Sequence, residues 1–87
     1  MRILIVEDER RLAEALGAIM EEQKYSADVV FNGQDGLDYA LSGQYDVIVL
    51  DVMLPKLTGF EVCQQIREFS NVPVIMLTAK GDDMDKI

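Results

Sequence analysis

The sequence predicts an α/β fold in which a parallel sheet carries helices on both faces. Two continuous apolar runs, at residues 3–6 and 47–50, are typical of strands that are buried on both sides, as they are in parallel sheets. Segments with the apolar spacing of helices alternate with short apolar runs along the 87 residues. Right-handed crossovers bring such strands into one parallel sheet. The length allows one small domain.

The first half of the chain predicts a strand, a helix, a second strand and a second helix. Residues 2–6 form the first strand, and residues 9–22 have helical periodicity, with an expected inward face of Leu12, Ala15, Leu16, Ile19 and Met20. The second strand covers residues 27–31. Asp28 lies within it, which indicates an edge position with one wetter face.

The second predicted helix covers residues 34–42 and ends at Gly43, a residue typical of helix C-termini. Its expected inward residues are Leu37, Ala40 and Leu41. The third strand covers residues 46–51 and has the most apolar run of all. A loop follows in which Pro55 fixes φ and Gly59 permits a close approach, so we expect a stiff, shaped connection.

The last elements are a third helix and a fourth strand. Thr58 and Glu61 have the spacing of a capping box, which predicts a helix over residues 59–69. Its expected buried stripe is Phe60, Cys63, Ile66 and Phe69. Pro73 opens a strand over residues 74–78, and a polar loop then leads into another helix near the end of the chain.

The composition excludes several classes of function. The chain has 16 acidic and 8 basic residues and a net charge of −8, which argues against direct binding of nucleic acid or of an anionic membrane surface. It has no histidine, so histidine-based catalysis and histidine-ligated metals are excluded. The single cysteine, Cys63, allows no intrachain disulfide and fits a cytoplasmic protein; we expect it to pack in the core.

Several familiar sequence signals are also missing. The sequence has no signal-peptide pattern and no apolar stretch near the ~20 residues of a membrane helix. It contains neither glycine-rich nucleotide-binding motif, and its acids do not follow EF-hand spacing.

Acidic residues end two of the predicted strands. Glu7 and Asp8 follow the first strand, and Asp51 ends the third. Ligands of open α/β sheets bind beyond the carboxyl ends of the strands, so these three carboxylates are expected at one site. Such a cluster repels itself and favours a hard cation such as Mg²⁺. The alternative is that these acids only terminate strands and cap helices, with Asp8 as the N-cap of the first helix.

Two further polar residues follow the fourth strand on the same rim. The hydroxyl group of Thr78 could donate to an oxyanion, although threonine is common in strands. Lys80 could pair with a phosphate or with the acids, but a solvated loop lysine is the favoured interpretation.

These residues resemble a known family. Residues 1–8 (MRILIVED), 45–55 (YDVIVLDVMLP) and 72–80 (VPVIMLTAK), together with Gly59, are similar to the receiver domain of bacterial two-component response regulators. Residues 51–68 look most like the class whose receiver precedes a winged-helix DNA-binding domain. The resemblance implies a flavodoxin-like sheet with five strands in the order 2-1-3-4-5, of which the first four, in the order 2-1-3-4, lie in this chain.

The resemblance also implies roles for individual residues. Asp51 matches the phosphoacceptor, which takes a phosphoryl group from a histidine kinase. Glu7, Asp8 and Asp51, with the backbone carbonyl of Met53, match the Mg²⁺ site. Thr78 matches the hydroxyl residue that senses the phosphoryl group. Such a domain is a signalling module and not a turnover enzyme, and it controls transcription through a DNA-binding domain.

The chain departs from the family pattern at its end. We expect residues 1–87 to be a truncated receiver that lacks the fifth strand with its lysine and aromatic switch residue, most of the fourth helix, the fifth helix and the output domain. Lys80 matches another family residue and does not replace the missing lysine. The uncovered fourth strand and apolar faces predict self-association, as a homodimer or higher oligomer.

Three functions remain open at this point. The first is a phosphoacceptor signalling module, which predicts Mg²⁺ binding and modification at Asp51. The second is a half-flavodoxin-like fragment, natural or engineered, that assembles and no longer signals, so that Asp51→Asn would change nothing. The third is a small Mg²⁺-dependent phosphatase with Asp51 as nucleophile, which turnover of a phosphate ester would reveal.

Overall fold

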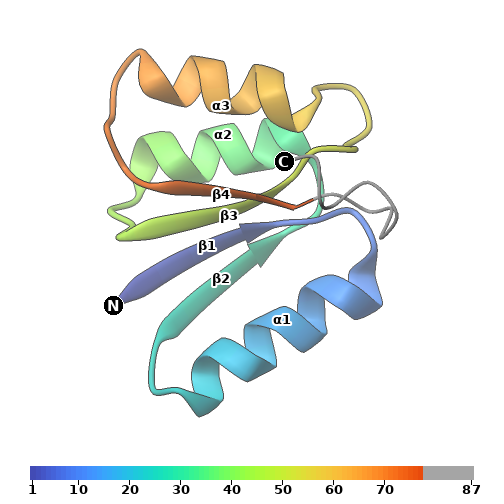
Figure 1. Ribbon diagram of the computed structural model, residues 1–87, viewed down its shortest axis with the longest axis vertical. Coiled ribbons are helices and arrows are strands. Elements are labelled where there is room, and N and C mark those ends of the chain that lie inside the picture. The colour runs from blue at the N-terminus through green and yellow to red at the C-terminus, as the bar shows by residue number, and fades with distance from the viewer. Residues whose placement is uncertain (78–87) are drawn as a thin grey trace.

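A sheet of parallel strands forms the centre of the protein, in a computed structural model that describes residues 1–77 (Figure 1). The strands are β1 (Arg2–Val6), β2 (Ser26–Val30), β3 (Val47–Asp51) and β4 (Val74–Leu77). Their order is β2-β1-β3-β4, which confirms the predicted order 2-1-3-4. β2 is an edge strand, as Asp28 indicated, and the predicted strand bounds hold to within one residue over the described part of the chain.

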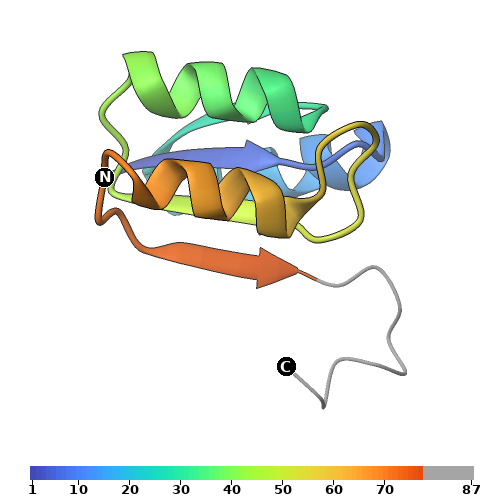
Figure 2. The same cartoon turned by 90° about the horizontal axis from the view of Figure 1, so that it is seen from above.

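Helices cover both faces of this sheet. They are α1 (Arg10–Glu22), α2 (Gly33–Ser42) and α3 (Gly59–Arg67). α2 and α3 lie side by side on one face and α1 lies on the other, as Figures 1 and 2 show. No helix within residues 1–77 is both long and apolar enough to cross a membrane.

The two faces of the sheet bury alternate residues of the same strands, as expected of a buried parallel sheet. The core between the sheet and the helices α2 and α3 consists of Leu4, Val6, Val30, Leu37, Ile48, Leu50, Leu54, Val62 and Ile66. Against α1 lie Ile3, Ile5 and Val49, with half-buried Leu16 and Met20. Cys63 is half-buried and packs on the first of these clusters, as predicted.

The inward face of α1 differs from the predicted one. Ala13 and Gly17 are its buried residues, whereas Leu12 and Ile19 are 45% and 51% exposed, and Ala15 is exposed as well. The helix lies so close to the sheet that a Cβ atom on Gly17 would be 3.0 Å from a methyl group of Val29. Small residues therefore occupy the contact, and the predicted inward position was wrong for Leu12, Ala15 and Ile19.

The other two helices also bury fewer large residues than predicted. Leu37 is buried and Ala40 half-buried, but Leu41 is 59% exposed. In α3, Val62 and Ile66 are buried and Phe60 is 63% exposed; the helix ends at Arg67 and not at residue 69, and Phe69 beyond it is 44% exposed. Ile66 and Cys63 of the predicted stripe do pack on the core, but at the start of the helix Gly59 and not Phe60 lies against the sheet.

The helix ends are fixed by side chains and by backbone geometry. Thr58 and Glu61 form the predicted capping box, with N–H···O distances of 3.2 and 2.9 Å. α1 ends in a Schellman motif, in which Lys24 has φ 70° and Tyr25 N–H donates to the Met20 carbonyl. Gly43 caps α2 in an extended conformation with φ −102°, and a Cβ atom there would overlap the ring of Tyr45.

A polar network joins three segments at the amino ends of the strands. The carboxylate of Asp28 accepts from Arg2 Nη2 at 3.2 Å and from the hydroxyl group of Tyr45 at 2.7 Å. The guanidinium group of Arg2 lies 4.8 Å from the centre of the Tyr45 ring, and Arg2 N–H donates to Asp46. This end of the sheet is the one opposite to the carboxyl ends of β1 and β3.

Candidate functional site

Three carboxylates meet at the carboxyl ends of β1 and β3. The register pairs Val6 with Leu50, so Glu7 and Asp8 emerge beside Asp51. One carboxylate oxygen from each of these three acids lies within 4.8 Å of the others. Glu7 and Asp51 are only 4% and 2% exposed, whereas Asp8 is exposed. The sequence-based expectation that these three side chains come together is therefore met.

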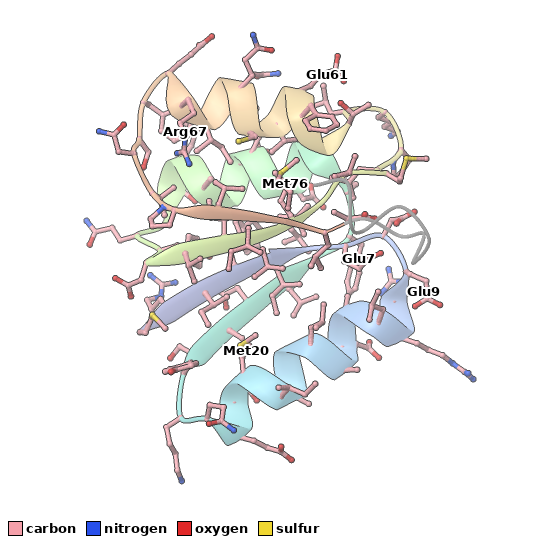
Figure 3. All side chains as sticks on the ribbon, viewed as in Figure 1. Glu7, Glu9, Met20, Glu61, Arg67 and Met76 are labelled. Atoms are coloured by element: carbon pink, nitrogen blue, oxygen red, sulfur yellow. The ribbon has the colours of Figure 1, made fainter. Side chains whose placement is uncertain are left out.

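Backbone groups hold Glu7 at the end of its strand. Its own N–H donates to the Val30 carbonyl at 3.1 Å, and its Oε2 accepts the N–H of Glu9 at 3.0 Å. Figure 3 shows Glu7 where β1 ends and Glu9 at the start of α1. The N-cap of α1 is Glu9, whose carboxylate accepts the N–H of Leu12 at 2.7 Å, so the alternative of Asp8 as N-cap is wrong.

Glu9 was not singled out from the sequence. Glutamate is not among the preferred N-cap residues, so the sequence carries no clear signal for this role. Because Asp8 is not engaged in the cap, its carboxylate stays with the acidic cluster. Glu9 thus connects the start of α1 to the site through its backbone and side chain together.

Asp51 is oriented by the turn that follows β3. Its Oδ1 accepts the N–H of Met53 at 3.2 Å. Val52 N–H donates to the Leu77 carbonyl at 2.9 Å, and the Val52 carbonyl accepts the N–H of Gly59 at 2.9 Å. The predicted close approach at Gly59 is confirmed, because a Cβ atom on Gly59 would overlap the backbone of Asp51.

Burial makes ionisation of these acids unfavourable. The pKa of Glu7 is raised from 4.5 to about 7; burial is the main cause, the hydrogen bond from Glu9 opposes it in part, and the charge of Asp51 adds to it. Burial also raises the pKa of Asp51; the hydrogen bond from Met53 opposes this shift and the charge of Asp8 adds to it. Within residues 1–77, no lysine or arginine forms an ion pair with these carboxylates.

The donor set fits a hard divalent cation. Two buried carboxylates and an exposed one converge without a basic partner in the described part of the chain, and Mg²⁺ binds through carboxylate oxygens and water. The side chain of Met53 is 61% exposed, and the role expected for its backbone carbonyl stays a prediction. Thr78 and Lys80 lie outside the described residues.

A family model described as the response regulator receiver domain matches residues 3–87. The chain belongs to this family. The receiver is 48% identical over 88 residues to the transcriptional regulatory protein DltR of Streptococcus agalactiae, and 49% identical over 86 residues to the response regulator ArlR of Staphylococcus aureus. The alignments cover 100% and 99% of this receiver but 39% of each relative, so the chain spans well under half of their length.

Solved structures of receivers have the same fold. The response regulator TrrA of Thermotoga maritima, in complex with Mg²⁺-BeF, superposes with a TM-score of 0.87 and 34% identity over 99% of this chain and 76% of that one. The second is the receiver domain of a sensor histidine kinase of Pseudomonas aeruginosa, with a magnesium ion coordinated in the active site cleft. It superposes with a TM-score of 0.86 and 31% identity over 97% of this chain and 73% of that one. The flavodoxin-like architecture of this receiver is thereby confirmed.

Proposed function

We propose that this receiver accepts a phosphoryl group on Asp51 in a Mg²⁺-dependent reaction. The observation that carries the proposal is the convergence of Glu7, Asp8 and Asp51 at the carboxyl ends of two adjacent parallel strands, with Asp51 buried. The proposal is also supported by family membership and by the magnesium named with two similar receivers.

In this proposal, the carboxylate of Asp51 is the nucleophile. Met53 N–H holds Oδ1, and the second carboxylate oxygen, Oδ2, is the atom that would attack in this proposal. A bond forms between this oxygen and phosphorus while the bond from phosphorus to the donor breaks. The electron pair leaves with the donor atom, which is the imidazole nitrogen when the donor is a phosphohistidine.

Glu7 and Asp8 would hold Mg²⁺ together with Asp51 and the carbonyl of Met53. A bound Mg²⁺ would neutralise charge on the phosphoryl oxygens. Burial and the neighbouring acids favour the protonated forms of Glu7 and Asp51. Asp51 must be ionised to act as a nucleophile. Because its surroundings disfavour the ionised form, a bound cation would be needed to stabilise it, and the reaction would then depend on Mg²⁺.

The decisive experiment is intact mass spectrometry after incubation with acetyl phosphate and Mg²⁺. We expect the added mass of one phosphoryl group in the wild-type chain, and none in Asp51→Asn or when EDTA replaces Mg²⁺. Asp46→Asn is the matched control, because Asp46 lies near the start of the same strand, at the opposite end of the sheet. An unmodified wild-type chain, or modification that survives Asp51→Asn, contradicts the proposal.

For the whole protein, we propose a histidine kinase as phosphodonor and control of transcription as output. The proposal rests on the family and on the transcriptional regulators among the relatives. The role is signalling: each molecule is modified once at Asp51 and Thr78 senses the modification. Multiple turnover of a phosphate ester would instead favour the phosphatase.

We also propose that copies of this chain associate across β4. Within residues 1–77, no strand pairs with the outer edge of β4. Ile75, which pairs with Val49 on the α1 face, is 54% exposed. An open apolar edge strand is a template for pairing with another chain.

Light scattering over a range of protein concentrations tests this association. We expect an oligomer for the wild-type chain and for Phe69→Lys, a control at another exposed apolar residue, and a monomer for Ile75→Lys. A wild-type chain that stays monomeric at every concentration refutes the association and leaves the proposal on Asp51 intact.

A further inference from the structure

Gly59 is the first residue of α3, and it lies against the backbone of the strand that carries Asp51. A Cβ atom here would overlap the Asp51 carbonyl oxygen and lie 2.8 Å from the Cα atom of Val52. Both neighbours are backbone atoms, which cannot rotate out of the way as a side chain can. Any residue other than glycine would therefore push the start of α3 and the end of β3 apart.

One peptide group connects Gly59 to the carboxylate of Asp51. The Val52 carbonyl accepts the N–H of Gly59 at 2.9 Å. The N–H on the other side of the same peptide bond belongs to Met53 and donates to Asp51 Oδ1 at 3.2 Å. Because a peptide group is planar, a bond that fixes its carbonyl also fixes the direction of its N–H.

The donor at Gly59 is well suited to this role. The first N–H groups of a helix have no partner within the helix and carry partial positive charge. Hydrogen bonds in series polarise one another, so donation to the Val52 carbonyl strengthens the N–H of Met53 as a donor. The capping box of Thr58 and Glu61 keeps this first turn in place.

We propose that Gly59 is a positioning residue for Asp51, acting through the Val52–Met53 peptide group. The inference rests on the proposed function of Asp51 as phosphoacceptor. Gly59 touches neither the phosphodonor nor the reacting oxygen. It sets the direction of the hydrogen bond that orients the carboxylate, and so the geometry of attack.

Gly59→Ala tests this inference against Gly43→Ala. A Cβ atom on Gly43 would also overlap its surroundings, at 2.6 Å from the Tyr45 ring, but at the other end of the sheet. Both variants should lose stability. Any decrease in the phosphorylation rate that comes only from destabilisation should therefore appear in both. Rates are compared per folded molecule, with the folded fraction measured by circular dichroism.

We expect Gly59→Ala to lower the maximal rate of phosphorylation by acetyl phosphate about tenfold or more at saturating Mg²⁺, because misplaced reacting groups have effects of this size. The apparent KM for acetyl phosphate should change little. Gly43→Ala should keep the wild-type maximal rate. In NMR spectra, the chemical shift of the Met53 amide proton should move toward that of an amide without a strong hydrogen bond. This change is expected in Gly59→Ala and not in Gly43→Ala.

The outcomes separate the inference from the function on which it rests. If the wild-type chain is not phosphorylated, the proposed function fails, and the Met53 amide signal still decides whether Gly59 orients this peptide. If Gly59→Ala matches Gly43→Ala in both rate and amide shift, the inference is overturned. If Gly59→Ala does not fold, Thr58→Ala loosens the same turn without added atoms; an unchanged Met53 shift there overturns the inference.

Discussion

Glu7 and Asp51 bury two carboxylates beside each other, with exposures of 4% and 2% and at least one oxygen of each within 4.8 Å of the other. They come from neighbouring parallel strands, and Asp8 adds a third acid at the rim. Burial and mutual repulsion both oppose ionisation of the pair. The folded chain therefore stores unfavourable charge at its site whenever these acids are ionised without a cation.

This arrangement makes the stability of the metal-free chain depend on pH. The pKa of Glu7 is about 7 in the fold against an ordinary value of 4.5, so the folded state binds more protons than the unfolded state between these values. The free energy of unfolding should then fall as pH rises from about 4.5 to about 7, by roughly 3 kcal/mol at most from this group.

Urea unfolding in EDTA at pH 5 and pH 8 measures this difference. Glu7→Gln should remove most of it, whereas Glu14→Gln, at an exposed position of α1, should retain it. Equal pH dependence in both variants would show that the effect has another origin.

Mg²⁺ should raise the melting temperature of the wild-type chain, because a ligand that binds only the folded state stabilises it. Asp51→Asn should melt higher than the wild-type chain in EDTA at pH 8, since it removes one of two buried charges. The same variant should lose most of the stabilisation by Mg²⁺. Differential scanning calorimetry with and without MgCl₂ measures both effects, and a full Mg²⁺ response in Asp51→Asn would argue against its role as a ligand.

Lys24→Gly should stabilise the fold by about 0.5–1 kcal/mol. Lys24 has φ 70° at the end of α1, a conformation that costs an L-residue energy and that glycine adopts freely. Gln23→Gly is the control, because Gln23 has φ −87° and glycine only adds flexibility there. In chemical denaturation, the free energy of unfolding should be higher than that of the wild-type chain for Lys24→Gly and lower for Gln23→Gly.

Tyr45→Phe should destabilise the fold by about 1 kcal/mol, because it deletes the hydrogen bond to the Asp28 carboxylate. Burial, and to a smaller extent that bond, raise the pKa of Tyr45 to about 12. Tyr39→Phe is the control, since Tyr39 is 45% exposed. If Tyr39→Phe lost as much stability as Tyr45→Phe, the loss in Tyr45→Phe could not be attributed to the hydrogen bond of its hydroxyl group.

The parallel strands and the meeting of the three acids were predictable for the same reason, whereas the strand order was implied by the resemblance to receiver domains. Apolar runs that end in acids, at Val6–Glu7 and Leu50–Asp51, define both the strands and the edge at which they finish. Parallel pairing leaves little choice about which ends lie together. The capping box of Thr58 and Glu61 was predictable because its two residues lie three apart in the sequence.

The inward faces of the helices were not predictable from the size of their apolar residues. α1 turns Ala13 and Gly17 to the sheet and leaves Leu12 and Ile19 outside, because the distance between helix and sheet is set by the whole packing arrangement. The contact of Gly59 with the Asp51–Val52 backbone was foreseen only as a close approach. Gly59 contacts backbone atoms of Asp51 and Val52 and donates to a backbone carbonyl. Every residue has these backbone atoms, so the sequence does not indicate which of them Gly59 contacts.

The central place of β1 has a consequence for synthesis on the ribosome. β1 is made first and pairs with both β2 and β3, yet β3 follows it by roughly 40 residues, or about 2–8 s at usual rates of translation. During that interval the run Ile3–Val6 has at most β2 to pair with, once residues 26–30 have been made, and its other edge stays open. The emerging chain is therefore most exposed to chaperones, and to other nascent chains, before residue 51 has left the tunnel.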